Sequence, residues 1–170
     1  MERIDTNHHE TELADGFVVR KGWSDTLAEE LVDVSRQPHI LKYTPNDAAK
    51  RFADPDAAFE WYKGKERHVY ALRKDEKLAG IVWFSRNERP HLDADYTFAI
   101  RVYQEALGQG MSEPLMRQAH DDFLASHPDT SVWLATDWDN KAALKLYDKF
   151  GYEKVGATDD GRITMLYQKD

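Results

Sequence analysis

The chain has 170 residues, which is enough for one domain with a substantial core. Its 23 Lys and Arg against 31 Asp and Glu give a net charge of −8, which argues against binding nucleic acid or an anionic membrane by bulk charge. The absence of Cys excludes disulfides, zinc–thiolate sites and a cysteine nucleophile. No apolar run approaches the ~18 residues of a membrane helix, and the polar start lacks the pattern of a signal peptide, so we expect a cytoplasmic protein.

The first half of the chain is predicted as tail, strand, helix, loop and helix. Residues 1–14 carry few apolar side chains, so we expect a flexible tail ahead of a single domain over residues 15–170. Ser24 or Asp25 is suited to cap the first helix, and Pro55 is suited to the first turn of the second. In chain order the strand, helix, loop and helix cover residues 16–21, 24–35, 36–47 and 55–63.

The second half is richer in strands and ends in a hairpin. The predicted strands cover residues 68–73, 77–85, 93–103, 131–136, 152–157 and 162–167, and the predicted helices residues 108–126 and 140–150. Residues 86–91 are turn-like. Runs of strands with helices between them indicate an α+β fold. We expect one mixed, mostly antiparallel sheet of about six or seven strands, with about four helices on its faces.

A glycine turn at the start of a predicted helix has the pattern of an anion site. The segment LGQGMS over residues 107–112 places two glycines one residue apart, where exposed backbone N–H groups and the helix dipole can hold a phosphate. A glycine pair at this position serves capping or packing about as often. No Gly-Lys-Ser/Thr follows, so this is not a P-loop, and Glu113 occupies the third glycine position of a dinucleotide fingerprint.

A second motif, N-x-x-A-x-x-L-Y-x-K-F-G-Y over residues 140–152, makes the pattern specific. Ala143, Leu146, Tyr147 and Phe150 share one helix face, and Gly151 suits the position just past the helix end. Together with the glycine turn and the apolar strand between them, this motif resembles the GCN5-related N-acetyltransferase (GNAT) family. The likeness is strongest over residues 96–155.

The resemblance implies acetyl-CoA as co-substrate, bound in a cleft where strands 96–103 and 131–136 splay apart, and no metal. It implies that the backbone of Ile100, Arg101 and Val102 binds the pantetheine arm, and that Asn140 contacts the cofactor. The pyrophosphate is expected on the N–H groups of Leu107, Gly108, Gln109, Gly110, Met111 and Ser112. The chain departs from the family pattern at Leu107, where Arg or Gln is usual, and at Ser112, where Gly or Ala is usual. We therefore expect a weakened phosphate contact.

The implied reaction is direct attack of a primary amine on the thioester, with Tyr147 as general acid toward the leaving thiolate. The position of Tyr147 on an apolar helix face also fits an aromatic side chain of the core. The base is left open between His91, Asp93, Asp95, Glu105 and water. The alternating positions 91, 93 and 95 predict one face at the start of a strand, which could bind an ammonium, relay its proton or hold a metal.

The acceptor is predicted to be an amine of a small molecule or peptide, and the acidic balance favours a cationic one. We expect its site in loop 36–47, the helix near Trp61 and the hairpin loop 158–162. Six aromatic side chains could supply a pocket, although most are expected in the core: Trp23, His39, Tyr43, Trp61, Trp83 and Phe84. The sequence leaves open whether the protein forms a homodimer. The alternatives are a non-catalytic acyl-CoA-binding module and a nucleotide-binding protein that uses the glycine turn.

Overall fold

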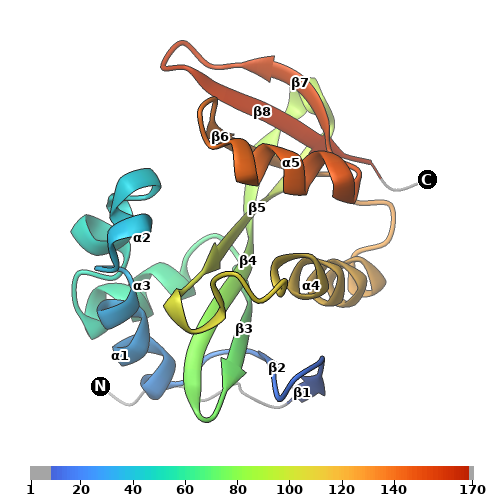
Figure 1. The fold of residues 1–170 in the computed structure, drawn as a ribbon. Helices are drawn as coiled ribbons and strands as arrows, with labels where there is room; N and C mark the ends of the chain where they lie inside the picture. Colours follow the sequence, from blue (N-terminus) through green and yellow to red (C-terminus); the bar gives the residue numbers. More distant parts are fainter. Residues whose placement is uncertain (1–8, 169–170) are drawn as a thin grey trace.

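The chain alternates between strands and helices largely as the sequence predicts (Figure 1). A computed structural model describes residues 9–168. The strands are β1 (His9–Glu12), β2 (Val18–Lys21), β3 (His68–Lys74), β4 (Lys77–Arg89), β5 (Ala94–Val102), β6 (Val132–Asp137), β7 (Glu153–Ala157) and β8 (Arg162–Tyr167). The helices are α1 (Asp25–Val34), α2 (Pro38–Tyr43), α3 (Pro55–Lys63), α4 (Ser112–Ser126) and α5 (Lys141–Phe150), with short helical turns η1 (Asp47–Arg51), η2 (Pro90–Leu92) and η3 (Gln104–Ala106).

The described strands form one eight-stranded sheet in the order β1-β2-β3-β4-β5-β6-β8-β7. β5 and β6 are parallel, and the other neighbours are antiparallel. Helices α1, α2 and α3 lie on one face, and α4 and α5 on the other (Figure 1). The predicted fold class, a mixed and mostly antiparallel sheet between helices, is confirmed, with β1 as the additional strand.

Side chains at the helix ends explain where the helices begin and stop. Ser24 Oγ accepts a hydrogen bond from the N–H of Leu27 at 3.1 Å and caps α1. Asn140 Oδ1 accepts from the N–H of Ala143 at 3.3 Å and caps α5. Gly151, with φ of +125°, follows the last turn of α5 in a conformation that favours glycine. The ends predicted for these two helices are therefore confirmed.

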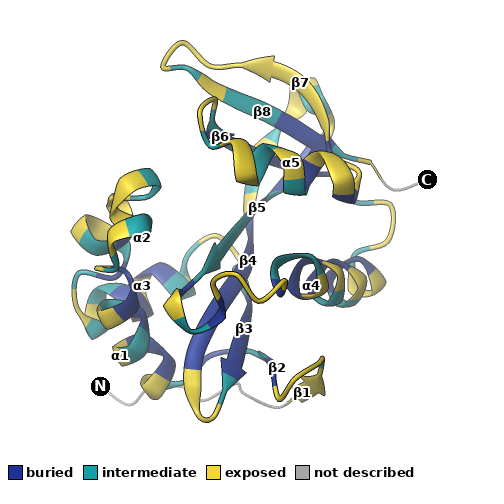
Figure 2. Ribbon diagram, viewed as in Figure 1, coloured by how far each residue is buried: buried dark blue, intermediate teal, exposed yellow. Residues whose placement is uncertain are grey.

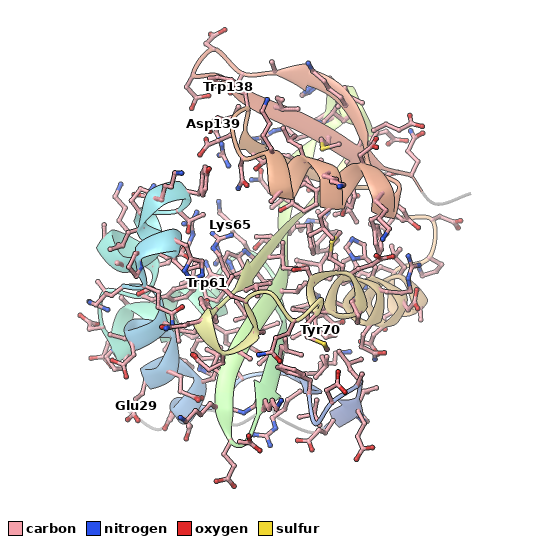
Figure 3. The ribbon with its side chains drawn as sticks, in the orientation of Figure 1. Glu29, Trp61, Lys65, Tyr70, Trp138 and Asp139 are labelled. Carbon is pink, nitrogen blue, oxygen red and sulfur yellow. The ribbon has the colours of Figure 1, made fainter. Side chains whose placement is uncertain are left out.

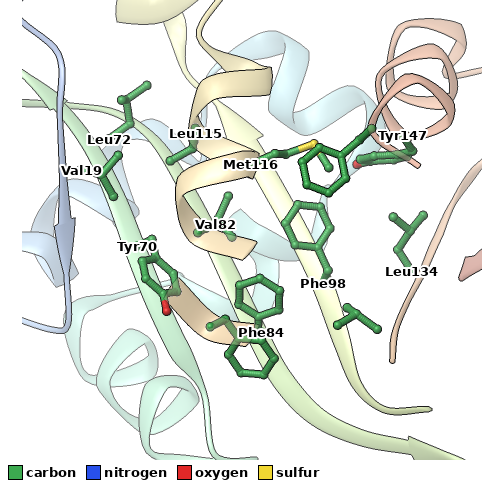
Figure 4. Packing of buried hydrophobic residues seen from close by; sticks show 14 of the residues in the cluster. Val19, Tyr70, Leu72, Val82, Phe84, Phe98, Leu115, Met116, Leu134 and Tyr147 are labelled. Carbon is green, nitrogen blue, oxygen red and sulfur yellow. The ribbon is translucent and has the colours of Figure 1, made fainter. Parts of the chain in front are cut away.

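Alternation along the strands divides the core between the two faces of the sheet. On the α4–α5 face, an apolar cluster includes Val82 and Phe84 of β4 and Phe98 of β5 (Figure 4). On the α1–α3 face, a second cluster includes Ile81 and Trp83 of the same strand β4. Because β4 is buried on both faces over most of its length, it appears as a continuous dark band in Figure 2.

Four segments differ from the prediction. The helix predicted over residues 108–126 begins at Ser112, because the left-handed glycines at 108 and 110 hold the preceding residues in a turn. Residues 9–12, placed in the flexible tail, form β1, while residues 1–8 of that tail lie outside the described residues. All four residues of β1 are exposed and are held through backbone pairing with β2, so no apolar pattern marks them. Loop 36–47 contains α2, because Pro38 stands in a first turn where a proline is tolerated and Ile40 anchors the turn in the core. Residues 86–89 extend β4 rather than turning.

None of the helices among residues 9–168 is both long enough and apolar enough to span a bilayer.

Candidate active site

The two parallel strands at the centre of the sheet separate soon after they meet. Their register consists of two pairs, Tyr96 with Val132 and Thr97 with Trp133. Thr97 Oγ1 also donates a hydrogen bond to the carbonyl of Trp133 at 3.0 Å. Beyond this point β5 continues to Val102 without pairing to β6. The splay expected from the sequence is therefore present in the structure.

The free edge of β5 presents peptide groups to this gap. The N–H of Tyr103 donates to the carbonyl of Ala79 at 2.9 Å, so position 103 bonds toward β4, and the alternation of an antiparallel ladder turns Ile100 and Val102 away from β4. Their carbonyls accept from the α1–α3 side: Arg101 Nη1 lies 3.1 Å from Ile100 O, and His39 Nε2 lies 2.8 Å from Val102 O. The N–H groups of Ile100 and Val102 are left facing the gap.

A cleft of about 870 Å³ passes through the splayed region. Its lining includes Phe98 and Leu134, which face α4 and α5, and also Ala99 and Ala135, which point to the opposite face. Since successive residues of a strand face opposite sides, a lining that contains both sets means that the cleft opens on both faces of the sheet. Two different molecules can therefore approach the same point from opposite sides.

Tyr147 of α5 lines this cleft and is 8% exposed. Its ring packs edge-on against Phe98 at 6.2 Å between centroids, and Figure 4 shows it beside Phe98 and Met116. Burial raises the pKa of Tyr147 to about 12, and the nearby Arg101 and Arg162 guanidiniums act in the opposite direction. The hydroxyl is therefore protonated at neutral pH, and no hydrogen bond to another described residue occupies it.

Behind Tyr147 lies a fully buried polar pair. Tyr152 OH and His120 Nε2 are 2.7 Å apart, and His120 Nδ1 lies 2.7 Å from the carbonyl of Met116. Burial lowers the pKa of His120 to about 4, so the ring is neutral at pH 7. With Nδ1–H donating to Met116 O, Nε2 accepts the proton of Tyr152. The pair is satisfied within the core and lies outside the cleft lining.

The glycine turn has the geometry that an anion requires. Gly108 and Gly110 have φ values of +73° and +70°, and a Cβ at either position would meet no atom within 4 Å. These glycines are therefore needed for backbone conformation and leave open space in front of the loop. Within the described part of the chain, the N–H groups of Gly110, Ser112 and Glu113 have no hydrogen-bond partner. They belong to the loop and to the first turn of α4, where a helix start favours negative charge.

The residues implied for the cofactor fall into two groups. Ile100, Arg101, Asn140 and Tyr147 line the cleft, whereas Val102 and the loop 107–112 lie outside its lining. Leu107 is 48% exposed, so its side chain covers no part of the core. The Asn140 side chain is engaged in capping α5.

The side chain of Arg101 belongs to a buried ion cluster on the α1–α3 face. Its Nε and Nη2 donate to Asp47 Oδ2 and Oδ1 at 2.7 and 3.2 Å. Asp47 is fully buried, and Arg51 donates to its Oδ1 at 3.1 Å. Arg101 also stacks over Trp83 at 4.7 Å. This cluster fastens η1 to β5 beside the cleft.

The candidate bases do not share one strand face, so that prediction is wrong. His91 lies in η2 and Asp93 follows it with a left-handed φ of +52°, and Asp95 alone of the three lies within β5. Glu105 lies in η3. Of these four residues, His91 lines the cleft. Among residues 9–168 no group of three or more His, Asp or Glu side chains is arranged to hold a metal ion.

The predicted acceptor region contributes part of the cleft wall. Tyr43 and Thr44 of the 36–47 segment and Trp83 of β4 line it, as does the 158–162 hairpin loop with the exception of Gly161. Trp138 and Asp139 follow β6 beside this hairpin (Figure 3). The other aromatic candidates serve elsewhere, as expected for most of them: Trp23, Trp61 and Phe84 are buried in the two cores, and His39 bonds to β5.

Sequence reasoning missed Arg51 and Arg89 of the lining, and it included Arg162 only as part of the hairpin loop 158–162. Arg89 stacks over Trp133 at 4.3 Å, and Arg162 donates to the carbonyl of Ala135 at 2.7 Å. These contacts join residues 27 to 44 positions apart in the sequence, so no local pattern announces them. The net charge of −8 does not indicate them either, because it sums over the whole chain.

Comparison with known proteins agrees with this geometry. Residues 41–152 match the sequence model of the acetyltransferase (GNAT) family. The chain therefore belongs to the GNAT acetyltransferase family, which confirms the resemblance inferred from the two motifs. An acetyl-CoA-dependent N-acetyltransferase is the class of enzyme that this membership indicates.

The individual proteins to which the chain is similar share less than a third of its residues. The chain is 28% identical over 137 residues to mycothiol acetyltransferase of Mycobacteroides abscessus, a match that covers 80% of this chain and 43% of that protein. The chain thus spans less than half the length of that curated relative. Ribosomal-protein-S5-alanine acetyltransferase from Vibrio fischeri has a similar fold, with a TM-score of 0.76, 17% identity, and coverage of 96% of this chain and 98% of that one. The putative acetyltransferase yncA from Salmonella typhimurium, solved with its cofactor acetyl-CoA, has a TM-score of 0.74 at 15% identity over 92% and 95% of the two chains.

Proposed function

We propose that this protein transfers the acetyl group of acetyl-CoA to the primary amine of a small molecule or peptide. The observation that carries the proposal is the cleft through the splayed strands, which has Tyr147 in its wall and the unpaired edge of β5 beside it. Family membership supports the same reaction. Bound acetyl-CoA would supply an activated acyl group as a thioester.

The cofactor side would be the face that carries α4 and α5. The amides of Gly110, Ser112 and Glu113 are suited to hold the diphosphate, because they lack partners and stand at a helix start. The amides of Ile100 and Val102 are suited to bind the pantetheine arm along the free edge of β5. A peptide N–H at this edge would also polarise the thioester carbonyl.

Tyr147 would donate a hydrogen bond to the departing sulfur. A thiolate with an ordinary pKa of about 8.5 is a weaker base than the phenolate of a Tyr147 whose pKa is raised to about 12. The hydroxyl therefore stabilises the developing charge as a hydrogen-bond donor and keeps its own proton, and the departing thiolate takes its proton from solvent. Arg101 and Arg162 favour any negative charge that gathers on the phenol oxygen.

The acceptor would enter from the α1–α3 face, where α2 and the β7–β8 hairpin flank the cleft. An alkyl ammonium must lose a proton before its nitrogen attacks. His91, on the cleft wall, or a water molecule takes this proton.

Two measurements test the proposal against its alternatives. Isothermal titration with acetyl-CoA should show binding, and titration with ATP should not, which separates an acyl-CoA protein from a nucleotide-binding one. Thiol release from acetyl-CoA should then rise when a panel of amines is added. Binding of acetyl-CoA without amine-dependent thiol release across the panel would leave the non-catalytic acyl-CoA module as the function.

A further inference from the structure

The mouth of the cleft on the α1–α3 face is rich in arginine, although the protein as a whole is acidic. Four guanidinium side chains line the cleft, namely Arg51, Arg89, Arg101 and Arg162. They come from η1, β4, β5 and β8, so four elements converge to place positive charge there. All four belong to the side from which the acceptor would enter.

The cluster around Asp47 carries more positive than negative charge. Arg101 takes both oxygens of the Asp47 carboxylate, and Arg51 shares one of them through Nη1 alone. One buried carboxylate therefore faces two guanidiniums. The Arg51 side chain is 37% exposed, and within the described residues its remaining donors have no partner.

A third guanidinium adds to this excess. Burial, followed by the charge of Arg51, lowers the pKa of Arg67 to about 10. Arg67 donates to the carbonyls of Trp61 and Gly64 and has no carboxylate partner among residues 9–168. Arg51 thus lies among cations and lines the cleft, with donors that have no partner among the described residues.

Arg89 is a second guanidinium without a carboxylate partner in the described part of the chain. It stacks on Trp133 and donates to Asn87 Oδ1 at 3.0 Å, which fixes its plane without neutralising its charge. A planar, fixed guanidinium presents donors that match a carboxylate.

Resting on the proposed acetyl transfer, we propose that the acceptor amine also carries a carboxylate, as a free amino acid does, and that Arg51 binds this carboxylate with Arg89 as the second cation. A dication such as a polyamine would place a second positive charge among these guanidiniums. Asp159 and Asp160, exposed on the hairpin loop across the cleft, complement the amine end of such a zwitterion. The net negative charge of the chain is therefore a poor guide to the charge of its acceptor.

The test compares amino acids with their decarboxylated counterparts as acceptors. The rate is measured as thiol release at saturating acetyl-CoA. Suitable pairs are phenylalanine with phenethylamine, leucine with isoamylamine, and lysine with cadaverine. We expect kcat/KM of the preferred amino acid to exceed that of its decarboxylated partner by at least ~10-fold, the scale of one hydrogen bond to a charged group.

The variant Arg51→Gln removes the proposed contact and leaves the Arg101–Asp47 pair in place. It should lower kcat/KM for the preferred amino acid ~10-fold and leave the decarboxylated amine within about twofold. Lys50→Gln, an equal loss of charge at the neighbouring exposed residue of η1, should change neither value. Acetyl-CoA affinity should stay unchanged in both variants.

The outcomes separate the inference from the function on which it rests. Two results with active protein overturn the inference alone. In the first, thiol release shows no preference for the amino acid over its decarboxylated partner in any pair. In the second, Arg51→Gln lowers kcat/KM equally for both members of the pair. A loss of acetyl-CoA affinity in Arg51→Gln also overturns it, since Arg51 would then serve the cofactor. Absence of thiol release with every amine contradicts the proposed acetyl transfer itself.

Discussion

The two faces of the sheet are stabilised in different ways. On the α4–α5 face, apolar and aromatic side chains surround one neutral polar pair, His120 with Tyr152. On the α1–α3 face, tryptophans pack beside an ion cluster in which the buried Asp47 pairs with Arg101 and with the partly exposed Arg51. The first face carries the family motifs, and the second carries the charge that would meet an acceptor. Under the proposed function, the comparison places the chemistry shared by the family and the selection of the acceptor on opposite sides of one cleft.

The largest expected effect comes from removing the buried carboxylate of the α1–α3 face. Asp47→Ala leaves the largely buried Arg101, and the partly exposed Arg51, without their carboxylate, and we expect a loss of about 3–5 kcal/mol in the free energy of unfolding. Urea unfolding measures it. Asp33→Ala, which removes an exposed carboxylate from the last turn of α1, is the control and should cost almost nothing. A loss below about 1 kcal/mol for Asp47→Ala would show that the cluster does not hold this face.

The next effect concerns the neutral pair on the opposite face. His120 has a pKa of about 4 when folded and an ordinary one of about 6.5 when unfolded, so the unfolded chain binds more protons between these values and stability falls as pH falls. We expect wild-type protein to lose about 3 kcal/mol more than His120→Asn between pH 7 and pH 4. The exposed His91→Asn should keep the wild-type slope. Parallel slopes for wild type and His120→Asn would mean that His120 is not held neutral.

A somewhat smaller effect tests the chemistry of the α4–α5 face. Tyr147→Phe should lower kcat by ~10²-fold with little change in acetyl-CoA affinity, because it removes the donor to the leaving sulfur. Since the pKa of Tyr147 is about 12, the ratio of wild type to variant should stay constant from pH 6 to pH 10. Tyr152→Phe removes the hydroxyl of a ring 6.0 Å away and should keep wild-type turnover. Equal kcat for wild type and Tyr147→Phe would assign Tyr147 to the core.

The smallest effect tests the glycine turn. Gly110→Val places a side chain in the open space before the loop and strains a φ of +70°, so acetyl-CoA affinity should fall ~10-fold. Gly16→Val imposes similar strain at φ of +83° in the turn before β2, and should leave acetyl-CoA affinity unchanged. Titration calorimetry compares the two. Unaltered affinity in a folded Gly110→Val protein would place the diphosphate elsewhere.

The same contrast explains what the sequence could predict. The α4–α5 face is encoded by local signals: a cap at Asn140, a left-handed Gly151, and an apolar helix face that contains Tyr147. Each signal spans a few residues, so the motif and the fold class could be predicted together. The strand splay was expected only because the resemblance to the family implies it, and the two-pair register of β5 and β6 bears it out.

The acceptor face depends on contacts that are distant in sequence. Asp47 and Arg101 are separated by 54 positions, and nothing near either residue in the chain specifies the other. Within the loop predicted over residues 36–47, Pro38 begins α2. Net charge averages over the whole chain, so it could not indicate that four arginines line one cleft. For these reasons the arginines of the α1–α3 face could not be predicted from the sequence.

The most direct test of the account is the structure of crystals soaked with coenzyme A. We expect density for the diphosphate within hydrogen-bond distance of the amides of Gly110 and Ser112, and density for the thiol near the Tyr147 hydroxyl, between β5 and β6. Density on the arginine-lined face, or protein that takes up no coenzyme A at saturating concentration, would contradict the division of the cleft into a cofactor side and an acceptor side.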